Sequence, residues 1–267
     1  MHNIPETAEA RKKWLLDPQN RNPLVRGGAG SVYYTGDLSK PETVKLVISK
    51  RAAAVGEGLA HFGGLSEKED TVPGDSVRTG QNNACREGRE EMAELLGYEP
   101  DLDVAKFQLL YVAHDDAFFI NNGHGFAVNA SLHAYPMDQK TFNALFPNGA
   151  TKRERCENHD GPVETAYAEV MDFMDVLTLQ DSYHYAHEYF ALWVMASKMM
   201  NQDVLKLLDR VNDKMPSGKR VDFNKVAAKM HTDLATLETY LGLKGKGQLR
   251  AYENGQINRS RPQNFKR

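Results

Sequence analysis

The stretch "NACREGREEMAELLG", residues 83–97, places four glutamates on one predicted helix. Glu87, Glu90, Glu91 and Glu94 stand at offsets of zero, three, four and seven, so their carboxylates lie along a single stripe. Like charges at these spacings destabilise an isolated helix by about 0.2–0.5 kcal/mol per pair. The stripe is therefore either a solvated acidic surface or a site for a positively charged partner that the sequence does not contain.

Oxygen-rich surfaces of this kind suit hard divalent cations. Mg²⁺ prefers oxygen ligands, keeps several waters and also binds substrate phosphates, so the stripe favours Mg²⁺, with Mn²⁺ as the alternative, and phosphate chemistry. The competing interpretation is an acidic surface helix, which usually carries Lys or Arg at matching offsets. Here Arg86 can reach Glu90 four residues on, whereas Arg89 has no acid at that offset.

The residues around the stripe add a recognisable pattern. Lys50 and Arg51 end a β-rich run, Gly64 closes "HFGG", and residues 86–91 read R-E-x-x-E-E. This arrangement resembles the Nudix hydrolase family, whose signature is G-x5-E-x7-R-E-U-x-E-E-x-G-U, where U is a bulky aliphatic residue. The resemblance covers about residues 26–200 in architecture, and its motif content is confined to about residues 46–97.

The chain also departs from that signature. Between Gly64 and Arg86 there are 21 residues where the family has 13, and we place the additional residues in a surface loop over residues 65–81. Within this loop Asp75 is the favoured upstream acid, with Glu69 as the alternative. Gly88 replaces the expected bulky residue, and a glycine inside a helix costs about 1 kcal/mol relative to alanine. The closing G-U is absent, and Gly97 is the expected helix end.

The resemblance implies hydrolysis of a nucleoside diphosphate linked to another group, with water attacking one phosphorus. Mg²⁺ would neutralise the phosphate oxygens and lower the pKa of the attacking water. By the same resemblance, Glu90 and Glu91 are the leading metal ligands, Glu87 is a third ligand or a base, and the Gly64 carbonyl could join them. Arg86 would hold a carboxylate in place.

Further site residues are assigned with less support from the signature. The segment "ETAYAEVMDFMDVLTL" resembles a later family segment, so Glu164 or Glu169 is the expected additional acid. Lys50, Arg51 and Asp75 are expected to contact the substrate. Tyr33 either stacks on a base or belongs to the sheet. His184 and His187 lie three residues apart but have no third ligand at a fitting spacing, so we do not expect a metal site there.

The order of the predicted elements gives the fold class. Strands, the acidic helix, further strands and a C-terminal helix over residues 181–200 predict an α+β protein, a Nudix-like α/β/α sandwich with a mixed sheet. We expect an N-terminal arm over residues 1–25, the Nudix domain over 26–200 and a small all-helical extension over 201–267. Helices are expected there near 203–214, 221–231, 233–242 and 248–253.

Composition indicates a soluble globular protein, with 41% hydrophobic and 26% charged residues in a chain of 267. No stretch approaches the roughly 20 apolar residues that cross a bilayer, and the N-terminus lacks the apolar core of a signal peptide, so we expect a cytoplasmic protein without membrane contact. The two cysteines, Cys85 and Cys156, are expected to be reduced.

Charge divides the chain unevenly, because residues 1–202 carry a net −10 and residues 203–267 a net +7. A basic tail attracts polyanions, and its end loosely resembles a helix-turn-helix segment. Three functions follow: a pyrophosphohydrolase acting on a compound such as ADP-ribose or NADH, a nucleotide-sensing regulator with a DNA-binding tail, and an RNA cap-removing hydrolase. The retained glutamates favour the enzyme. The tail could also serve in packing or in a homodimer.

Overall fold

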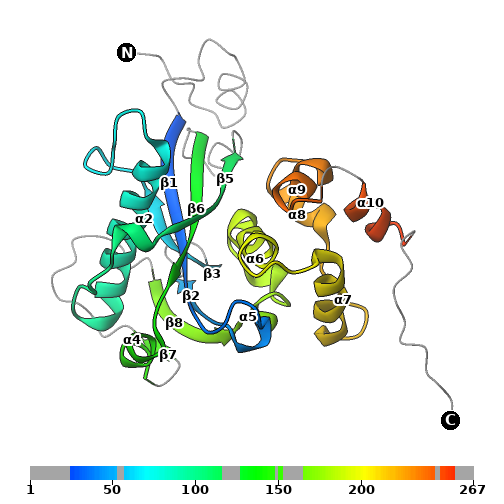
Figure 1. Cartoon of the computed structure of the whole chain (residues 1–267), viewed down its shortest axis with the longest axis horizontal. Helices are drawn as coiled ribbons and strands as arrows, with labels where there is room; N and C mark the ends of the chain where they lie inside the picture. Colours follow the sequence, from blue (N-terminus) through cyan, green and yellow to red (C-terminus); the bar gives the residue numbers. More distant parts are fainter. Residues whose placement is uncertain are drawn as a thin grey trace.

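A computed structural model describes residues 25–52, 57–115, 127–147, 150–152, 165–243 and 247–255. The predicted N-terminal arm, Glu164, Cys156 and the last residues of the tail lie outside these ranges. The described part is built on one mixed sheet with helices on both faces, as Figure 1 shows. The predicted fold class, an α/β/α sandwich followed by a helical extension, is therefore confirmed.

Within the described ranges the sheet has eight strands. They are β1 (Val25–Thr35), β2 (Lys45–Arg51), β3 (Gly58–Ala60), β4 (Phe62–Leu65), β5 (Gln108–Asp115), β6 (Ala127–Pro136), β7 (Ala150–Lys152) and β8 (Thr165–Asp172). The main order is β5-β6-β1-β2-β8-β7, with β4 paired to β1 and β3 paired to β2. Only the β1–β6 pair among these described strands is parallel. The short strands β3 and β4 thus add to β2 and β1, respectively, outside the main strand order.

Helices form the two outer layers. Helix α2 (Ser76–Leu96) and the shorter α4 (Gln139–Leu145) cover one face, and α5 (Phe173–Val176) and α6 (Ala186–Lys198) cover the other. Short 3-10 turns lie at Pro41–Thr43, Val104–Lys106 and Gln180–Ser182. Residues 165–176 contain both a strand and a helix, since β8 leads directly into α5.

Helix α2 has clear signals at both ends. Asp75 caps its N-terminus by accepting a hydrogen bond from the Arg78 N–H at 2.8 Å, and Gly97 ends it in the left-handed region with φ of 75°. The predicted end at Gly97 is confirmed. The predicted loop over residues 65–81 is wrong in its last third, because "VPGDS" is a helix start and α2 begins at Ser76.

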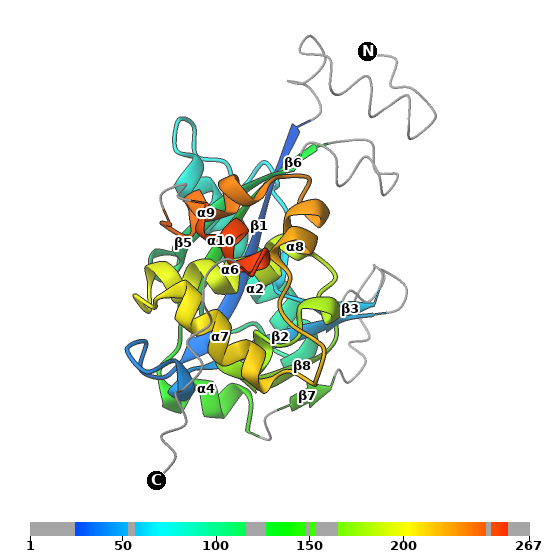
Figure 2. The same ribbon diagram turned by 90° about the vertical axis from the view of Figure 1, so that its right-hand side faces the viewer.

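The C-terminal extension consists of α7 (Val204–Lys214), α8 (Phe223–Lys229), α9 (Leu234–Tyr240) and α10 (Gln248–Glu253), close to the predicted ranges. These helices stack on α6, on the side away from the sheet, as both views show (Figures 1 and 2). The rings of Trp193 and Phe223 pack edge to face at 5.3 Å, and the Tyr240 hydroxyl donates to the Val112 carbonyl. One hydrophobic cluster therefore continues from the sheet through α6 into the extension.

Charge complementarity joins the basic extension to the acidic body. Three basic residues of α7 and α8 pair with acids before α6: Arg210 with Glu42 at 3.7 Å, Lys214 with Asp175, and Lys225 with Asp181. The uneven charge of the two parts is thus partly neutralised within the molecule. Every helix in the described ranges is too short or too polar to span a bilayer. Cys85 is a buried free cysteine.

Candidate functional site

Arg86 is the centre of the acidic stripe on α2. Its guanidinium donates to Glu90 at 2.9 Å and to Glu87 at 2.8 Å, and it contacts Asp70 at 3.2 Å. It also donates to the Leu65 carbonyl at 2.9 Å. Burial alone would lower the pKa of Arg86, but hydrogen bonding to Asp70 and the charges of Glu87 and Glu90 raise it above its ordinary value. The site therefore has a permanently charged centre.

Asp70 is the site residue that sequence analysis missed. Its side chain is 4% exposed, and it accepts from Arg86 and from the Glu67 backbone N–H at 2.8 Å. It stands six positions after Gly64, which is the spacing of the upstream acid in the signature, so this spacing was the signal available. The favoured Asp75 instead caps α2, and the alternative Glu69 is exposed.

This assignment also relocates the additional residues of the chain. They follow Asp70 rather than precede it, and most of them form the first turns of α2. Residues 76–85 add more than two helical turns before Arg86, and they include the buried Gly80, Asn83, Ala84 and Cys85. The lengthened helix, and not an enlarged loop, is therefore the main departure from the signature.

Gly64 lets a carboxylate approach the backbone of β4. A Cβ built at this position would lie 2.5 Å from Oε1 of Glu87, which no side chain tolerates. Any residue larger than glycine would displace the Glu87 carboxylate. Gly64 on β4 thus lies in direct contact with Glu87 in the middle of α2, while its role as a metal ligand stays a prediction.

The four glutamates of the stripe differ in exposure. The side chain of Glu90 is 58% exposed and that of Glu87 is 14% exposed, whereas Glu91 is buried and Glu94 is half-buried. A purely solvated acidic surface would not bury Glu91 or hold Glu87 against β4. The stripe therefore has an inner edge against the sheet and an outer edge at Glu90.

The carboxylates around Arg86 bear on whether a divalent cation fits this site. Within the described ranges, no three His, Cys, Asp or Glu side chains converge closely enough to hold a metal ion, because Glu87 and Glu90 both turn toward Arg86. The residue types nevertheless fit a hard cation, since all are oxygen donors and Gly64 leaves room for Glu87 beside the β4 backbone. These residues therefore fit a divalent cation, and Glu87 and Glu90 would have to change rotamer to bind it.

One predicted acid, Glu169, does not join the α2 site. Glu169 on β8 is exposed and pairs across the sheet with Ile48, whose side chain belongs to the cluster on the α6 face, opposite to α2. The structure therefore does not bring it to Arg86. Glu164, the other choice, lies outside the described residues.

Tyr33 is a core residue. Its side chain is fully buried, with the Phe62 ring at 5.5 Å and the Tyr135 ring at 5.4 Å, so it cannot stack on a base from solvent. This is a correction to its predicted substrate contact, and it bears out the alternative that Tyr33 belongs to the sheet. Alternation along β1 turns Tyr33 inward toward α2.

Lys50 and Arg51 lie at the end of β2, where the pairing with β8 is interrupted by a bulge. Both are partly exposed, with the Lys50 ammonium 5.6 Å from the Tyr167 ring and the Arg51 guanidinium 5.3 Å from the Tyr185 ring. They border β3 and the N-terminus of α6 rather than α2. The cations predicted to contact substrate therefore occupy a separate, aromatic-rich part of the surface.

A second residue missed from the sequence is Glu188 on α6. Its buried carboxylate accepts a hydrogen bond from the His61 backbone N–H at 2.9 Å. Burial raises the pKa of Glu188 to about 8 and lowers the pKa of the His61 imidazole to about 3. Both side chains are thus largely uncharged near neutral pH. No local pattern marks Glu188, because its burial depends on residues far away in the sequence, among them His61 and Gly30.

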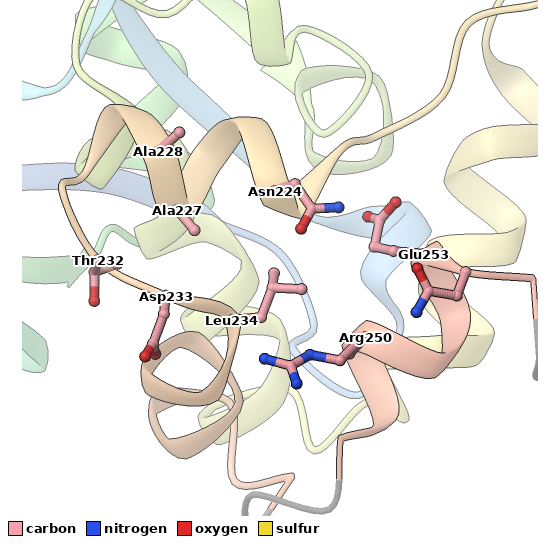
Figure 3. A pocket seen from close by; sticks show the side chains of 9 residues that line it. Asn224, Ala227, Ala228, Thr232, Asp233, Leu234, Arg250 and Glu253 are labelled. Carbon is pink, nitrogen blue, oxygen red and sulfur yellow. The ribbon is translucent and has the colours of Figure 1, made fainter.

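A pocket of about 440 Å³ lies elsewhere, within the C-terminal extension. Figure 3 shows its lining from α8, α9 and α10, with the guanidinium of Arg250 pointing toward the side of the pocket where Asp233 lies. Glu253 is already engaged, since it accepts from the Phe223 N–H and pairs with Arg220. This pocket is built without any residue of α2, so it takes no part in the acidic site.

Comparisons with known proteins were made for the family, the sequence and the structure. No family model and no curated protein matches the chain. A Nudix hydrolase from Alicyclobacillus acidocaldarius aligns with a TM-score of 0.40 and 14% identity, over 59% of this chain and 83% of that one. A C. elegans Ap4A hydrolase complex aligns with a TM-score of 0.39 and 11% identity, over 66% and 99%.

A third solved structure, Shewanella oneidensis NrtR, aligns over 88% of this chain and 86% of its own, with a TM-score of 0.34 and 13% identity. These likenesses concern the fold, and the site is defined by its own residues. In this chain the mixed sheet lies between helices, and β4, which contains Gly64, faces α2. Arg86 of α2 holds the side chains of Glu87, Glu90 and Asp70. In these features the chain resembles the Nudix hydrolase family.

Proposed function

We propose that the protein is a divalent-cation-dependent hydrolase that cleaves the pyrophosphate of a nucleoside diphosphate linked to a second group. The observation that carries this proposal is the Arg86 network, in which one guanidinium holds Glu87, Glu90 and the buried Asp70 beside Gly64. A helix that served only as a solvated acidic surface would require neither a buried acid such as Asp70 nor a glycine such as Gly64 beside its carboxylate. ADP-ribose and NADH are the first substrates to test.

In this proposal Glu87, Glu90, Glu91 and the Gly64 carbonyl would hold Mg²⁺ or Mn²⁺. When bound, the cation would neutralise phosphate oxygens and lower the pKa of the attacking water. Arg86 keeps two carboxylates close together at low energetic cost, because its charge offsets their repulsion. Asp70 in turn fixes the guanidinium from the buried side. Glu87 is the third ligand or the base.

Substrate binding is assigned to the aromatic-rich surface at the end of β2. Arg51 packs on Tyr185, whose ring stacks on His187 at 5.3 Å, so a cation and flat rings are available together. Such a set suits phosphates and a nucleobase. We expect Arg51→Ala to raise KM for a nucleotide substrate more than it lowers kcat, because Arg51 lies away from α2.

The test is Mg²⁺-dependent turnover across a panel of ADP-ribose, NADH, sugar nucleotides, dinucleoside polyphosphates and capped RNA. Glu90→Gln is the informative variant, and Glu94→Gln is its matched control, since Glu94 lies on the same stripe but outside the signature. Turnover that needs Mg²⁺, falls in Glu90→Gln and survives in Glu94→Gln supports the proposal. Equal turnover in wild type and Glu90→Gln would reject it.

The basic extension bears on the two other functions. Arg210, Lys214 and Lys225 pair with acids of the body, which favours a packing role over a free polyanion-binding surface. A regulator is nevertheless a distinct outcome of the same panel. Tight nucleotide binding without turnover, together with retention of DNA by the full chain, would favour the regulator over the enzyme.

A further inference from the structure

Gly88, in the middle of α2, lies directly against the hydroxyl of Tyr33 on β1. A Cβ built at position 88 would lie 1.8 Å from Oη and 3.1 Å from Cζ of Tyr33. Helix propensity alone would favour alanine at this position. The glycine is therefore explained by a tertiary contact, and any larger residue requires either Tyr33 or α2 to shift.

The Tyr33 ring has no room to shift. Its side chain is fully buried among Phe62, Phe107 and Tyr135, with ring centroids 5.5, 6.2 and 5.4 Å away. Cores packed at native density resist such displacement. Burial, above all, raises the pKa of Tyr33, and the nearby Glu91 charge adds to the effect, so the hydroxyl stays protonated. A side chain at position 88 would therefore push α2 outward.

The part of α2 that would move carries the acidic site. Glu87 adjoins Gly88 in the chain, and its carboxylate rests where a Cβ of Gly64 would be. Glu91 follows three residues later, on the same buried face as Gly88. An outward shift of α2 at Gly88 would separate Glu87 from the β4 backbone and lift Glu91 off the sheet.

We propose that the contact between Tyr33 and Gly88 sets the distance between α2 and the sheet. By doing so it holds Glu87 and Glu91 in the positions from which they bind the metal ion. The inference rests on the proposed function, since it concerns the same metal site. Tyr33 and Gly88 are positioning residues, because they act through the two glutamates.

The test compares Mn²⁺ affinity, measured by electron paramagnetic resonance, in wild type, Gly88→Ala, Tyr33→Phe and the double variant. Gly88→Ala is expected to bind Mn²⁺ about 10–100-fold more weakly, the usual effect of losing support around metal ligands. Tyr33→Phe should stay close to wild type. The double variant should recover most of the affinity, because the 1.8 Å overlap with Oη is removed and the contacts that remain, 3.1 Å to Cζ of position 33 and 3.3 Å to Cδ1 of Leu102, are much less severe.

Gly80 provides the matched control on the same helix. A Cβ there would lie 2.4 Å from Oγ of Ser131, so Gly80→Ala creates a comparable clash about two turns away. Gly80→Ala and Gly80→Ala/Ser131→Ala are expected to change the free energy of unfolding while leaving Mn²⁺ affinity near that of wild type. Equal weakening by Gly80→Ala would overturn the inference.

Further outcomes separate this inference from the proposed function. Wild-type Mn²⁺ affinity in folded Gly88→Ala, or no recovery in the double variant, would overturn the positioning role. If Gly88→Ala does not fold, Gly88→Val in the Tyr33→Phe background restores an overlap and should weaken binding relative to Gly88→Ala in that background; unchanged affinity would overturn the role. If wild type itself neither binds Mn²⁺ nor turns over any substrate, the proposed function fails instead.

Discussion

Single residues decide whether the acidic stripe is a site or a surface. Arg86 is shared by carboxylates from two segments, and only Asp70 among them is almost completely buried. A buried carboxylate without its partner is strongly unfavourable, so the pair specifies one arrangement of the loop after β4. At this scale the structure supplies the reason for three positions: Asp70 fixes Arg86, Gly64 admits Glu87, and Gly88 admits Tyr33.

Asp70→Asn is the first prediction at the residue scale. The amide removes a charge-assisted hydrogen bond from Arg86, so we expect a loss of about 1–3 kcal/mol in the free energy of unfolding. Urea unfolding checks the value. Turnover should fall as well, because Arg86 would no longer be fixed behind Glu87 and Glu90. Wild-type stability and turnover in Asp70→Asn would show that the pair has no structural role.

Glu188 gives a prediction for pH dependence. Its folded-state pKa, raised to about 8 by burial, exceeds the ordinary 4.5, so the folded state binds the proton more tightly. Its stabilising contribution is therefore present at low pH and is lost as pH rises from about 4.5 toward 8. Glu188→Gln keeps an acceptor for the His61 N–H and removes the titration.

The measurement is urea unfolding of wild type and Glu188→Gln at pH 5 and pH 8. We expect the variant to gain stability relative to wild type by more than about 1 kcal/mol between these two values. Comparison of the two proteins cancels His61, whose lowered pKa acts in the opposite direction in both. A difference that does not change with pH would mean that Glu188 is not a buried titrating group.

Among the elements, α2 connects the sequence motif to the fold. Its buried positions recur every three or four residues from Gly80 to Leu95, so one face of the helix covers the sheet. The caps at Asp75 and Gly97 fix where the helix begins and ends, and with them the height of each glutamate above β4. The helix is thus both a packing element and the carrier of the site.

Asp75→Ala tests the capping role. Loss of the bond to the Arg78 N–H should lower stability by about 1 kcal/mol, while KM for the substrate stays unchanged because Asp75 lies at the helix start, more than two turns before Arg86. Asp75→Ser, which retains a cap, serves as the control. A raised KM with unchanged stability would instead restore the substrate contact that the sequence predicts.

Across the whole molecule, the body and the extension share one core. Phe190 of α6 contacts Tyr111 of β5 as well as Phe223 of α8, and Trp193 of α6 also contacts Phe223. The Ser197 hydroxyl also donates to the Leu241 carbonyl at 2.7 Å. A domain border near residue 200 stays a prediction, and this shared core makes independent folding of the two parts unfavourable.

Truncation tests that expectation. A chain ending at residue 202 would expose the outer face of α6, so we expect aggregation or loss of cooperative unfolding. A chain ending at residue 255 keeps α7 to α10 and should behave as the full protein. Size-exclusion chromatography and thermal unfolding compare the two. A monomeric 1–202 chain with a sharp unfolding transition would contradict the shared core.

Local signals in the sequence predicted much of this fold, and tertiary contacts account for what they did not. Local residue patterns predict the glycine cap at Gly97, the alternation in β2 and the four described helices of the extension. They do not predict Glu188, because its burial depends on residues distant in the chain. Asp70 and the start of α2 did have local signals, the six-residue spacing from Gly64 and the cap at Asp75, but the inserted segment between Asp70 and Arg86 led to the wrong choice of acid and helix start. Gly88 stood out as a departure from the signature, and its close approach to the Tyr33 hydroxyl explains it.

The most direct measurement for the central claim is kcat/KM for ADP-ribose hydrolysis, or for the best substrate of the panel, with and without Mg²⁺. For wild type we expect turnover that requires Mg²⁺ or Mn²⁺. For Glu90→Gln we expect a fall of about 100-fold or more, the size expected when a metal ligand is lost. Glu94→Gln should stay near wild type. Metal-independent turnover, or full turnover in Glu90→Gln, would contradict the assignment of the α2 glutamates as the metal site.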